Sequence, residues 1–217
     1  MSRACDAAGR SAQSITLLAV SKTFDATAVR AAHAAGQRVF GENYVQEALA
    51  KIESLAALRA ELQWHLIGPL QSNKTRVVAE YFDWVHSIER LKIAERLAAQ
   101  RPPGLPPLQL CLQVNISGES SKSGFLPAQV AEAARAVAAL PAERVRLRGL
   151  MSIPEPAATA DAQRAPHRAL RELLGQLNAG GMGLDILSMG MSDDLEAAVA
   201  EGTTLVRVGS AIFGRRE

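Results

Sequence analysis

The sequence is poor in aromatic residues and almost free of cysteine. Aromatic residues make up 4% of the 217 residues, and the two cysteines are Cys5 and Cys111. Two cysteines cannot form the disulfide framework of a small secreted protein, and neither lies in a metal-binding or redox motif. The core must therefore consist mainly of Ala, Leu, Val and Ile. Cys111, inside the apolar run 108–114, is expected to be a small buried hydrophobe.

The sequence also lacks long apolar runs and clusters of like charge. No stretch approaches the roughly 20 apolar residues of a membrane span, and the polar segment 1–14 has no apolar signal-peptide core. The 24 Lys and Arg nearly balance the 22 Asp and Glu, which gives a net charge of +2. These features predict a cytoplasmic protein with neither a nucleic-acid nor a membrane partner.

Short apolar segments alternate with longer amphipathic segments along the whole chain. The apolar segments predict strands at 15–20, 38–40, 63–67, 84–86, 109–114, 146–150, 184–187 and 205–208. The amphipathic segments predict helices at 26–35, 44–57, 74–80, 88–100, 127–140, 160–177 and 193–200. This alternation predicts an α/β protein with parallel strands and right-handed crossovers.

Two architectures satisfy the alternation, an open doubly wound sheet and a closed (β/α)8 TIM barrel. Eight units in 217 residues give about 27 residues each, near the lower size limit of the barrel. No G-x-G-x-x-G motif follows the first predicted strand, which argues against the dinucleotide-binding sheet. We therefore expect a single barrel over 15–217 after a short polar segment 1–14, with the turn-rich stretch 101–107 as a loop within it.

Polar residues and glycines gather where the predicted strands end, which is the functional end of such a barrel. Lys22 ends an entirely apolar strand, so its surroundings are expected to lower the pKa of its amine. An amine of this kind forms Schiff bases with aldehydes. An ordinary surface lysine just past a strand end is an equally good interpretation of its position.

Two glycine-containing loops late in the chain, 188–192 and 207–210, follow the last two predicted strands. Loops at these positions bind phosphate in many barrels through backbone N–H groups, although both are also compatible with tight turns. Together with Lys22 they predict a phosphorylated aldehyde as ligand. Pyridoxal 5′-phosphate (PLP) fits, and so does a sugar phosphate in a Schiff-base aldolase.

Sequence motifs over about residues 17–215 separate these alternatives. The motifs are LLAVSKTF, FGENYVQEAL, WHLIGPLQSNKTR, VNISGESSKSGF, GLMSIP and LSMGMSDDLEAAVAEGTTLVRVGSAIFG. In order and spacing the sequence resembles the pyridoxal phosphate homeostasis protein family, single-domain barrels like the N-terminal domain of alanine racemase. The resemblance implies a non-enzymatic protein that carries PLP as an aldimine on Lys22 and buffers or delivers it within the cell.

The resemblance to alanine racemase also assigns roles to individual residues. It places Arg207 at the pyridine nitrogen and Lys122 near the ring hydroxyl. It assigns the phosphate to Ser192, Gly209 and Ser210. Asn43 and Met151, from the FGENYVQEAL and GLMSIP motifs, are expected to complete the pocket.

The sequence departs from the racemases where catalysis needs partners. It ends at Glu217 without the racemase domain that supplies a tyrosine, and Ile153 stands where the racemase has a histidine. A PLP carrier is therefore the first hypothesis, with an amino-acid racemase or other PLP enzyme second and an aldolase third. PLP-dependent apo-enzymes are the expected partners of a carrier, and the protein is expected to be a monomer or weak dimer.

Three further features lead to simple expectations. His65 and His86 end adjacent predicted strands without companion Cys or carboxylates, so they are expected to line the pocket mouth and not to bind metal. Trp64 and Trp84 are expected in the core or barrel wall. Family members usually begin with an additional helix. Here only a helix of about 10 residues, 3–13, would fit, so a barrel-bottom or surface contact is expected to be missing.

Overall fold

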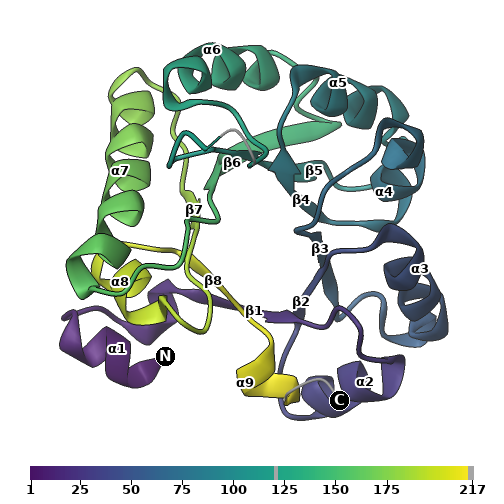
Figure 1. The fold of residues 1–217 in the computed structure, drawn as a ribbon. Coiled ribbons are helices and arrows are strands. Elements are labelled where there is room, and N and C mark those ends of the chain that lie inside the picture. The colour runs from purple at the N-terminus through teal and green to yellow at the C-terminus, as the bar shows by residue number, and fades with distance from the viewer. Residues whose placement is uncertain (120–121, 215–217) are drawn as a thin grey trace.

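The strands form a closed parallel barrel inside a ring of helices, as the alternation predicted (Figure 1). The computed structural model describes residues 1–119 and 122–214. Each strand pairs with the next, and pairing of Thr16–Ala19 with Leu205–Val208 closes the barrel. The strands are β1 (Thr16–Val20), β2 (Val39–Glu42), β3 (Gln63–Leu66), β4 (Trp84–Ile88), β5 (Leu108–Gln113), β6 (Val145–Met151), β7 (Ile186–Ser188) and β8 (Leu205–Val208).

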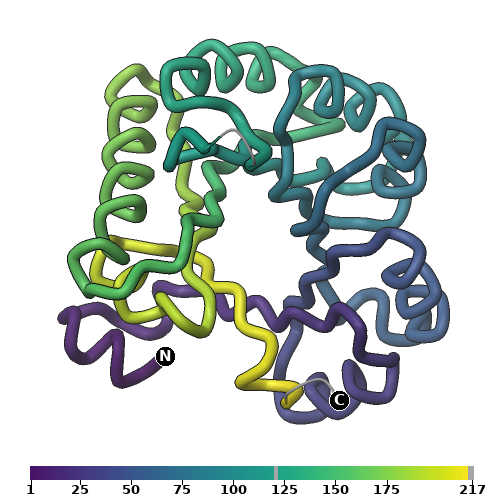
Figure 2. Tube along the Cα trace, in the orientation of Figure 1, coloured from purple at the N-terminus to yellow at the C-terminus, as the bar shows by residue number. Residues whose placement is uncertain are grey.

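Helices connect successive strands on the outside of the barrel, so the chain winds around it once (Figure 2). They are α1 (Ser2–Ala7), α2 (Ala26–Ala34), α3 (Val45–Ser54), α4 (Thr75–Tyr81), α5 (Leu91–Gln100), α6 (Pro127–Ala138), α7 (Ala160–Ala179), α8 (Leu195–Ala200) and α9 (Ser210–Phe213). Short 3-10 turns are η1 (Ala12–Ser14), η2 (Ala56–Leu58) and η3 (Ser72–Lys74). The core between strands and helices is dominated by Leu, Val, Ala and Ile, as the composition required, and Trp64 and Cys111 are buried in the molecule. Among the described helices, none has the length and apolarity needed to cross a bilayer.

Several element boundaries differ from the predictions because local pairing decides them. Ile88, predicted to start a helix, pairs with Leu112 as the last residue of β4, so α5 begins at Leu91. Residues 191–194 form a turn closed by Asp194, which delays α8 to Leu195. Tyr44 precedes α3 and is 57% exposed, so it does not contribute to the apolar face of that helix.

The N-terminal segment contains a shorter helix than expected, and this helix packs on the barrel. Helix α1 ends at Ala7, and Gly9 follows with a φ of 64°, a left-handed conformation that favours glycine. Ala4 and Cys5 of α1 are buried in a small apolar cluster with Val199 and Val206. The segment 1–14 therefore covers the barrel beside α8.

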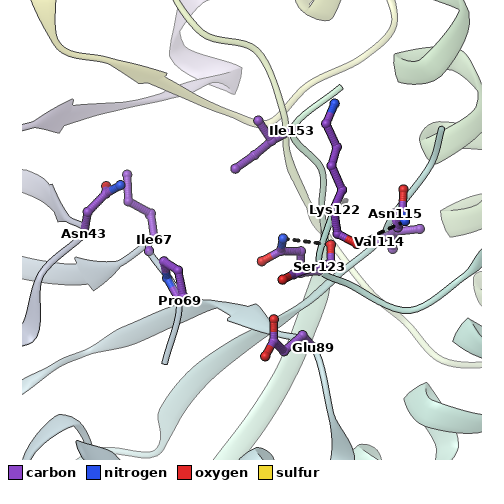
Figure 3. A pocket seen from close by; sticks show the side chains of 11 residues that line it. Asn43, Ile67, Pro69, Glu89, Val114, Asn115, Lys122, Ser123 and Ile153 are labelled. Atoms are coloured by element: carbon purple, nitrogen blue, oxygen red, sulfur yellow. Dashed lines mark hydrogen bonds between the residues drawn. The ribbon is translucent and has the colours of Figure 1, made fainter. Parts of the chain in front are cut away.

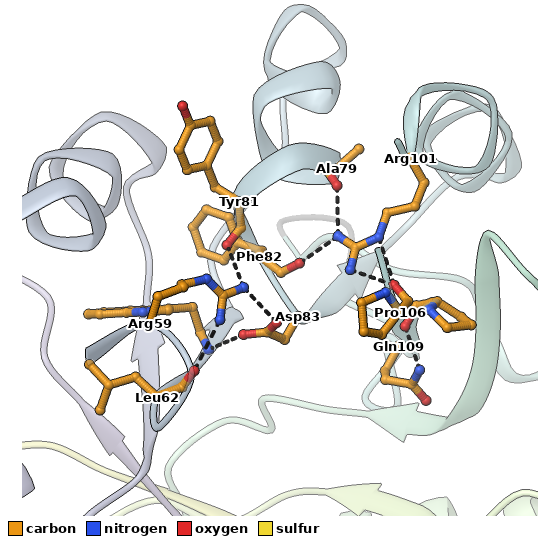
Figure 4. Close-up of polar contacts among 11 residues, drawn as sticks. Arg59, Leu62, Ala79, Tyr81, Phe82, Asp83, Arg101, Pro106 and Gln109 are labelled. Atoms are coloured by element: carbon orange, nitrogen blue, oxygen red, sulfur yellow. Dashed lines mark hydrogen bonds and ion pairs between the residues drawn. The ribbon is translucent and has the colours of Figure 1, made fainter. Parts of the chain in front are cut away.

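The loop 101–107 is held to the barrel by arginine hydrogen bonds (Figure 4). Arg101 donates from Nη1 to the carbonyl oxygens of Ala79 and Phe82, at 2.7 and 2.8 Å, and from Nε and Nη2 to that of Pro106. A neighbouring arginine bond involves Asp83, whose Oδ1 accepts from Nη2 of Arg59 at 2.7 Å. The bonds from Arg101 to Ala79 and Phe82 tie the loop between α5 and β5 to the rest of the barrel.

Candidate functional site

Lys22 and the loops after β7 and β8 line one cavity of about 520 Å³. Five of the residues expected to bind a ligand therefore meet, although they come from opposite ends of the sequence. Closure of the barrel makes β1 and β8 neighbours and brings these segments together. The lining residues are Val20, Lys22, Phe24, Met191, Ser192, Asp193, Arg207, Gly209, Ser210 and Gly214.

Arg207 contributes a buried cation to this cavity. It is 4% exposed, and Nη1 donates to the carbonyl oxygen and hydroxyl of Ser188 at 2.6 and 2.8 Å, while Nη2 donates to the carbonyl oxygen of Ser152 at 2.7 Å. Burial lowers the pKa of Arg207 to about 10, so the side chain stays protonated at neutral pH. These bonds use three of its five N–H groups. In the described part of the chain the other two form no hydrogen bond, which leaves donors for an acceptor in the cavity.

The turn that carries Ser192 is fixed by Asp194. Its Oδ1 accepts from the amide of Met191 at 2.6 Å, and its Oδ2 lies 2.9 Å from Nε2 of the buried His167 on α7. Burial raises the pKa of the Asp194 carboxyl, but the hydrogen bonds from His167 and Met191 outweigh burial, and the pKa lies below its ordinary value. Gly190 opens the turn with a φ of 94°, where a Cβ would lie 2.5 Å from Cβ of Ala198. The turn thus has both a conformation and a clearance that require glycine.

Asn43 and Lys122 line a second cavity, of about 260 Å³, at the same end of the barrel (Figure 3). Oδ1 of Asn43 is buried without a hydrogen-bond partner among the described residues, so it is available to a ligand donor. Lys122 forms an ion pair with Glu119 at 3.0 Å. Met151 lines neither cavity: its side chain is fully buried, and its carbonyl oxygen accepts from the amide of Val114 at 2.8 Å.

His65 and His86 do not line the pocket mouth, and that expectation was wrong. Both are almost completely buried, because each lies inside its strand and points into the barrel. Nδ1 of His86 lies 2.8 Å from Oγ of Ser188, which joins the non-adjacent strands β4 and β7 across the interior. Nε2 of His86 lies 2.9 Å from Nδ1 of His65. His86 and Arg207 thus share the hydroxyl of Ser188 as a hydrogen-bond partner, and His65 contacts His86 deeper in the barrel. No group of three or more potential metal ligands occurs among the described residues.

A buried ionic cluster flanks Lys22. Nζ of Lys51 lies 2.6 Å from Glu42 and 2.7 Å from Glu47, and it donates to the carbonyl oxygen of Ser21 at 2.7 Å. The amide of Thr23 donates to Glu47 at 2.5 Å. Thr23 has a φ of 69°, a left-handed conformation that costs a β-branched residue about 1–3 kcal/mol. The residues before and after Lys22 are therefore both held by α3.

Comparisons with known proteins show which family the chain belongs to. The family model for the alanine racemase N-terminal domain matches residues 4–217. The "Pyridoxal phosphate homeostasis protein" of Pseudomonas aeruginosa PAO1 is 62% identical over 214 residues, covering 99% of this chain and 90% of the relative. The protein of the same name from Escherichia coli K12 is 54% identical over 218 residues, with 100% and 92% covered. The chain belongs to the pyridoxal phosphate homeostasis protein family.

Solved structures of similar proteins share the barrel. PipY of Synechococcus elongatus PCC7942 without PLP has a TM-score of 0.87 at 41% identity, covering 98% of this chain and 99% of PipY. The same protein with PLP bound has a TM-score of 0.84 at 40% identity, with the same coverage. The alanine racemase of Corynebacterium glutamicum has a TM-score of 0.69 at 17% identity. The match covers 98% of this chain and 58% of the racemase, and it shows the fold alone.

The sequence motifs single out Lys22, but they do not single out the residues that hold the backbone on either side of it. Glu47 and Lys51 were not predicted as functional residues, because an i,i+4 Glu–Lys pair is typical of a solvated helix surface. One signal was available in the sequence. Lys51 is spaced three and four residues from Ala48 and Leu55, which places a charge on the apolar face of α3.

Proposed function

We propose that this protein binds PLP in the cavity around Lys22 and acts in intracellular PLP homeostasis by buffering and delivering the cofactor. The observation that carries the proposal is the convergence of Lys22, Arg207 and Ser192 on one cavity. Support comes from PipY, whose structure with PLP bound is 40% identical to this chain over nearly its whole length. Within the proposal, residues 15–217 form the PLP-binding barrel and 1–14 an accessory segment.

The residues around the cavity fit the chemical groups of PLP. When bound, PLP supplies an electrophilic aldehyde, a pyridine nitrogen and a phosphate dianion. The amine of Lys22 would hold the aldehyde, and the remaining N–H donors of Arg207 would face the ring nitrogen. Phosphate would be held by the hydroxyls of Ser192 and Ser210 and the backbone at Gly209. Asn43 and Lys122 line the second cavity, so their contact with polar groups of the ring would require PLP to extend toward them from the cavity around Lys22. The buried Met151 would support the pocket through packing.

Arg207 would limit how strongly the ring of bound PLP withdraws electrons. A protonated guanidinium only donates hydrogen bonds, so an acceptor nitrogen opposite it keeps its lone pair and remains unprotonated. An unprotonated ring withdraws less electron density from a bound substrate, which disfavours carbanion chemistry. With Arg207 at the ring nitrogen, bound PLP would therefore be a weaker electron sink than PLP with a protonated ring.

The proposal extends to compartment and partners. Cys5 and Cys111 are free and buried, as suits a reducing cytoplasm. The recipients of PLP would be PLP-dependent apo-enzymes, and the protein would act as a monomer or weak dimer.

The experiment that tests the function is a spectrophotometric titration of the cofactor-free protein with PLP. Wild type should develop the absorbance of PLP joined to an amine and saturate at one PLP per chain. Lys22→Ala should lose this absorbance but retain weak binding through the phosphate contacts, whereas Lys92→Ala, on the distant helix α5, should behave as wild type. A wild-type protein that binds no PLP would contradict the proposal.

A further inference from the structure

The backbone on both sides of Lys22 is tied to helix α3. Before it, the carbonyl oxygen of Ser21 accepts from Nζ of Lys51 at 2.7 Å. After it, the amide of Thr23 donates to Oε1 of Glu47 at 2.5 Å. The same oxygen of Glu47 lies 2.7 Å from Nζ of Lys51, so the two ties form one connected unit.

This unit is anchored in the interior. The side chains of Lys51 and Glu42 are 5% and 0% exposed, and they lie 2.6 Å apart. Oε1 of Glu42 also accepts from Oγ of Ser21 at 2.6 Å. Burial raises the pKa of the Glu42 carboxyl, while Lys51 opposes the rise. A charged side chain at such a depth requires polar partners, and two carboxylates and a carbonyl oxygen surround Nζ of Lys51.

The position of Thr23 shows why such ties are needed. Its left-handed φ of 69° is unfavourable for a β-branched side chain, so the segment would relax without an external restraint. Relaxation at Thr23 would turn the preceding residue, and Lys22 would then present its amine in a different direction. Neither Glu47 nor Lys51 lines the cavity around Lys22, so their direct contacts with this segment are to the backbone of Thr23 and Ser21.

We infer that Glu47 and Lys51 are positioning residues that set Lys22 for covalent attachment of PLP. The inference rests on the proposed function. In the attachment, Nζ of Lys22 forms a bond to the aldehyde carbon, and the aldehyde oxygen leaves as water with the two amine protons. The rate depends on the amine meeting the carbon in one orientation, and the Glu47–Lys51 unit holds the chain in that orientation.

The test compares two ligands on full-length variants. PLP reports attachment, followed by borohydride trapping at timed intervals and mass spectrometry of Lys22. Pyridoxine 5′-phosphate has an alcohol in place of the aldehyde, so its affinity reports only the ring and phosphate contacts. Glu47→Ala and Lys51→Met should slow attachment at least tenfold and change the affinity for pyridoxine 5′-phosphate less than threefold. Glu47→Gln keeps an acceptor for the amide of Thr23 and should recover most of the rate.

Glu201→Ala is the matched control. Glu201 is a carboxylate with 1% exposure that pairs with Arg164 and Arg168 of α7, away from Lys22. The control should lower Tm and leave the attachment rate unchanged. The inference is overturned if the Glu47→Ala variant attaches PLP as fast as wild type does. It is also overturned if Glu201→Ala slows attachment as much as Glu47→Ala does. Should Lys51→Met fail to fold, Glu47→Ala and its Gln counterpart decide the question. Wild type that binds neither ligand would overturn the proposed function itself, a result distinct from slow attachment in the variants alone.

Discussion

Nη1 of Arg207 donates to both oxygens of Ser188, at 2.6 Å to the carbonyl and 2.8 Å to the hydroxyl. Because a guanidinium has no acceptor, the Ser188 hydroxyl accepts there and can direct its own proton to Nδ1 of His86. His86 then carries its proton on Nε2 and donates to Nδ1 of His65. Each group in this chain thus donates to the next, from Arg207 at the cavity to His65 in the barrel interior.

Removing the link in this chain should cost stability. Ser188→Ala leaves Nδ1 of His86 buried without its partner and frees one donor of Arg207, so the free energy of unfolding should fall by about 1–3 kcal/mol. PLP should also bind more weakly, because Arg207 is less firmly held. Urea unfolding measures the first effect and PLP titration the second. The exposed Ser54→Ala should stay within about 0.5 kcal/mol of wild type; equal stabilities of the two variants would contradict the role given to Ser188.

The phosphate contacts predict graded losses of PLP affinity. Ser192→Ala removes a hydroxyl donor to a dianion, a bond worth roughly 1.5–3 kcal/mol, or about a tenfold or greater rise in Kd. Gly209→Val should be worse, because even a Cβ at Gly209 would lie 3.3 Å from the carbonyl oxygen of Val20 and 3.4 Å from its Cβ. Equilibrium titration with PLP provides the comparison. Unchanged Kd values in both variants would place the phosphate elsewhere.

The two buried histidines predict acid sensitivity. Burial lowers the pKa of His65 to about 3 from an ordinary 6.5, and burial with His65 and Arg207 nearby lowers that of His86 well below 6.5. Below pH 6.5 these histidines bind protons in the unfolded chain but not in the folded protein. Their contribution to the free energy of unfolding is therefore fully present above pH 6.5 and is lost as the pH falls, for His65 down to about pH 3.

Urea unfolding at two pH values measures this effect. Between pH 7.5 and 5.5 each histidine should account for about 1.4 kcal/mol, and the pair for about 2.7 kcal/mol. His65→Gln should roughly halve the pH-dependent loss. A free energy of unfolding that stays constant over this range would show that the histidines protonate in the folded protein.

The site predicts no steady racemisation. A racemase needs two positioned bases, and Lys22 is one at most. Neither tyrosine of the chain lines the cavity around Lys22, the lining carboxylate Asp193 is exposed to solvent, and Ile153, which lines the other cavity, cannot accept a proton. PLP-loaded protein incubated with L-alanine in D₂O should yield no D-alanine by chiral chromatography, and at most slow α-deuterium exchange by NMR. Turnover near 1 s⁻¹ or above would instead mark an enzyme.

The barrel and the convergence on Lys22 could be predicted because both leave local signals in the sequence. Strands covered on both faces are continuous apolar runs, so β1 and β8 were located closely. Parallel strands present their carboxyl ends together, which brought Lys22, Ser192 and Arg207 to one edge.

The remaining features depend on register and packing, which leave no such signal. The depth of His86 depends on where β4 ends: the strand continues to Ile88, so His86 lies inside the barrel and not at the strand end where a pocket residue was expected. Lys51 is buried only because α3 packs beside Ser21. Asn43 and Lys122 line a cavity of their own because the loops after β2 and β5 meet on that side of the mouth.

Borohydride reduction of the PLP-loaded protein, followed by peptide mass mapping, tests the central claim most directly. Reduction fixes PLP to whichever amine holds it, so the label identifies the residue without reference to spectra or affinity. The account predicts one label per chain, on Lys22, and none on the Lys22→Ala variant. A label on Lys122 or Lys51, or an unlabelled wild type, would contradict it.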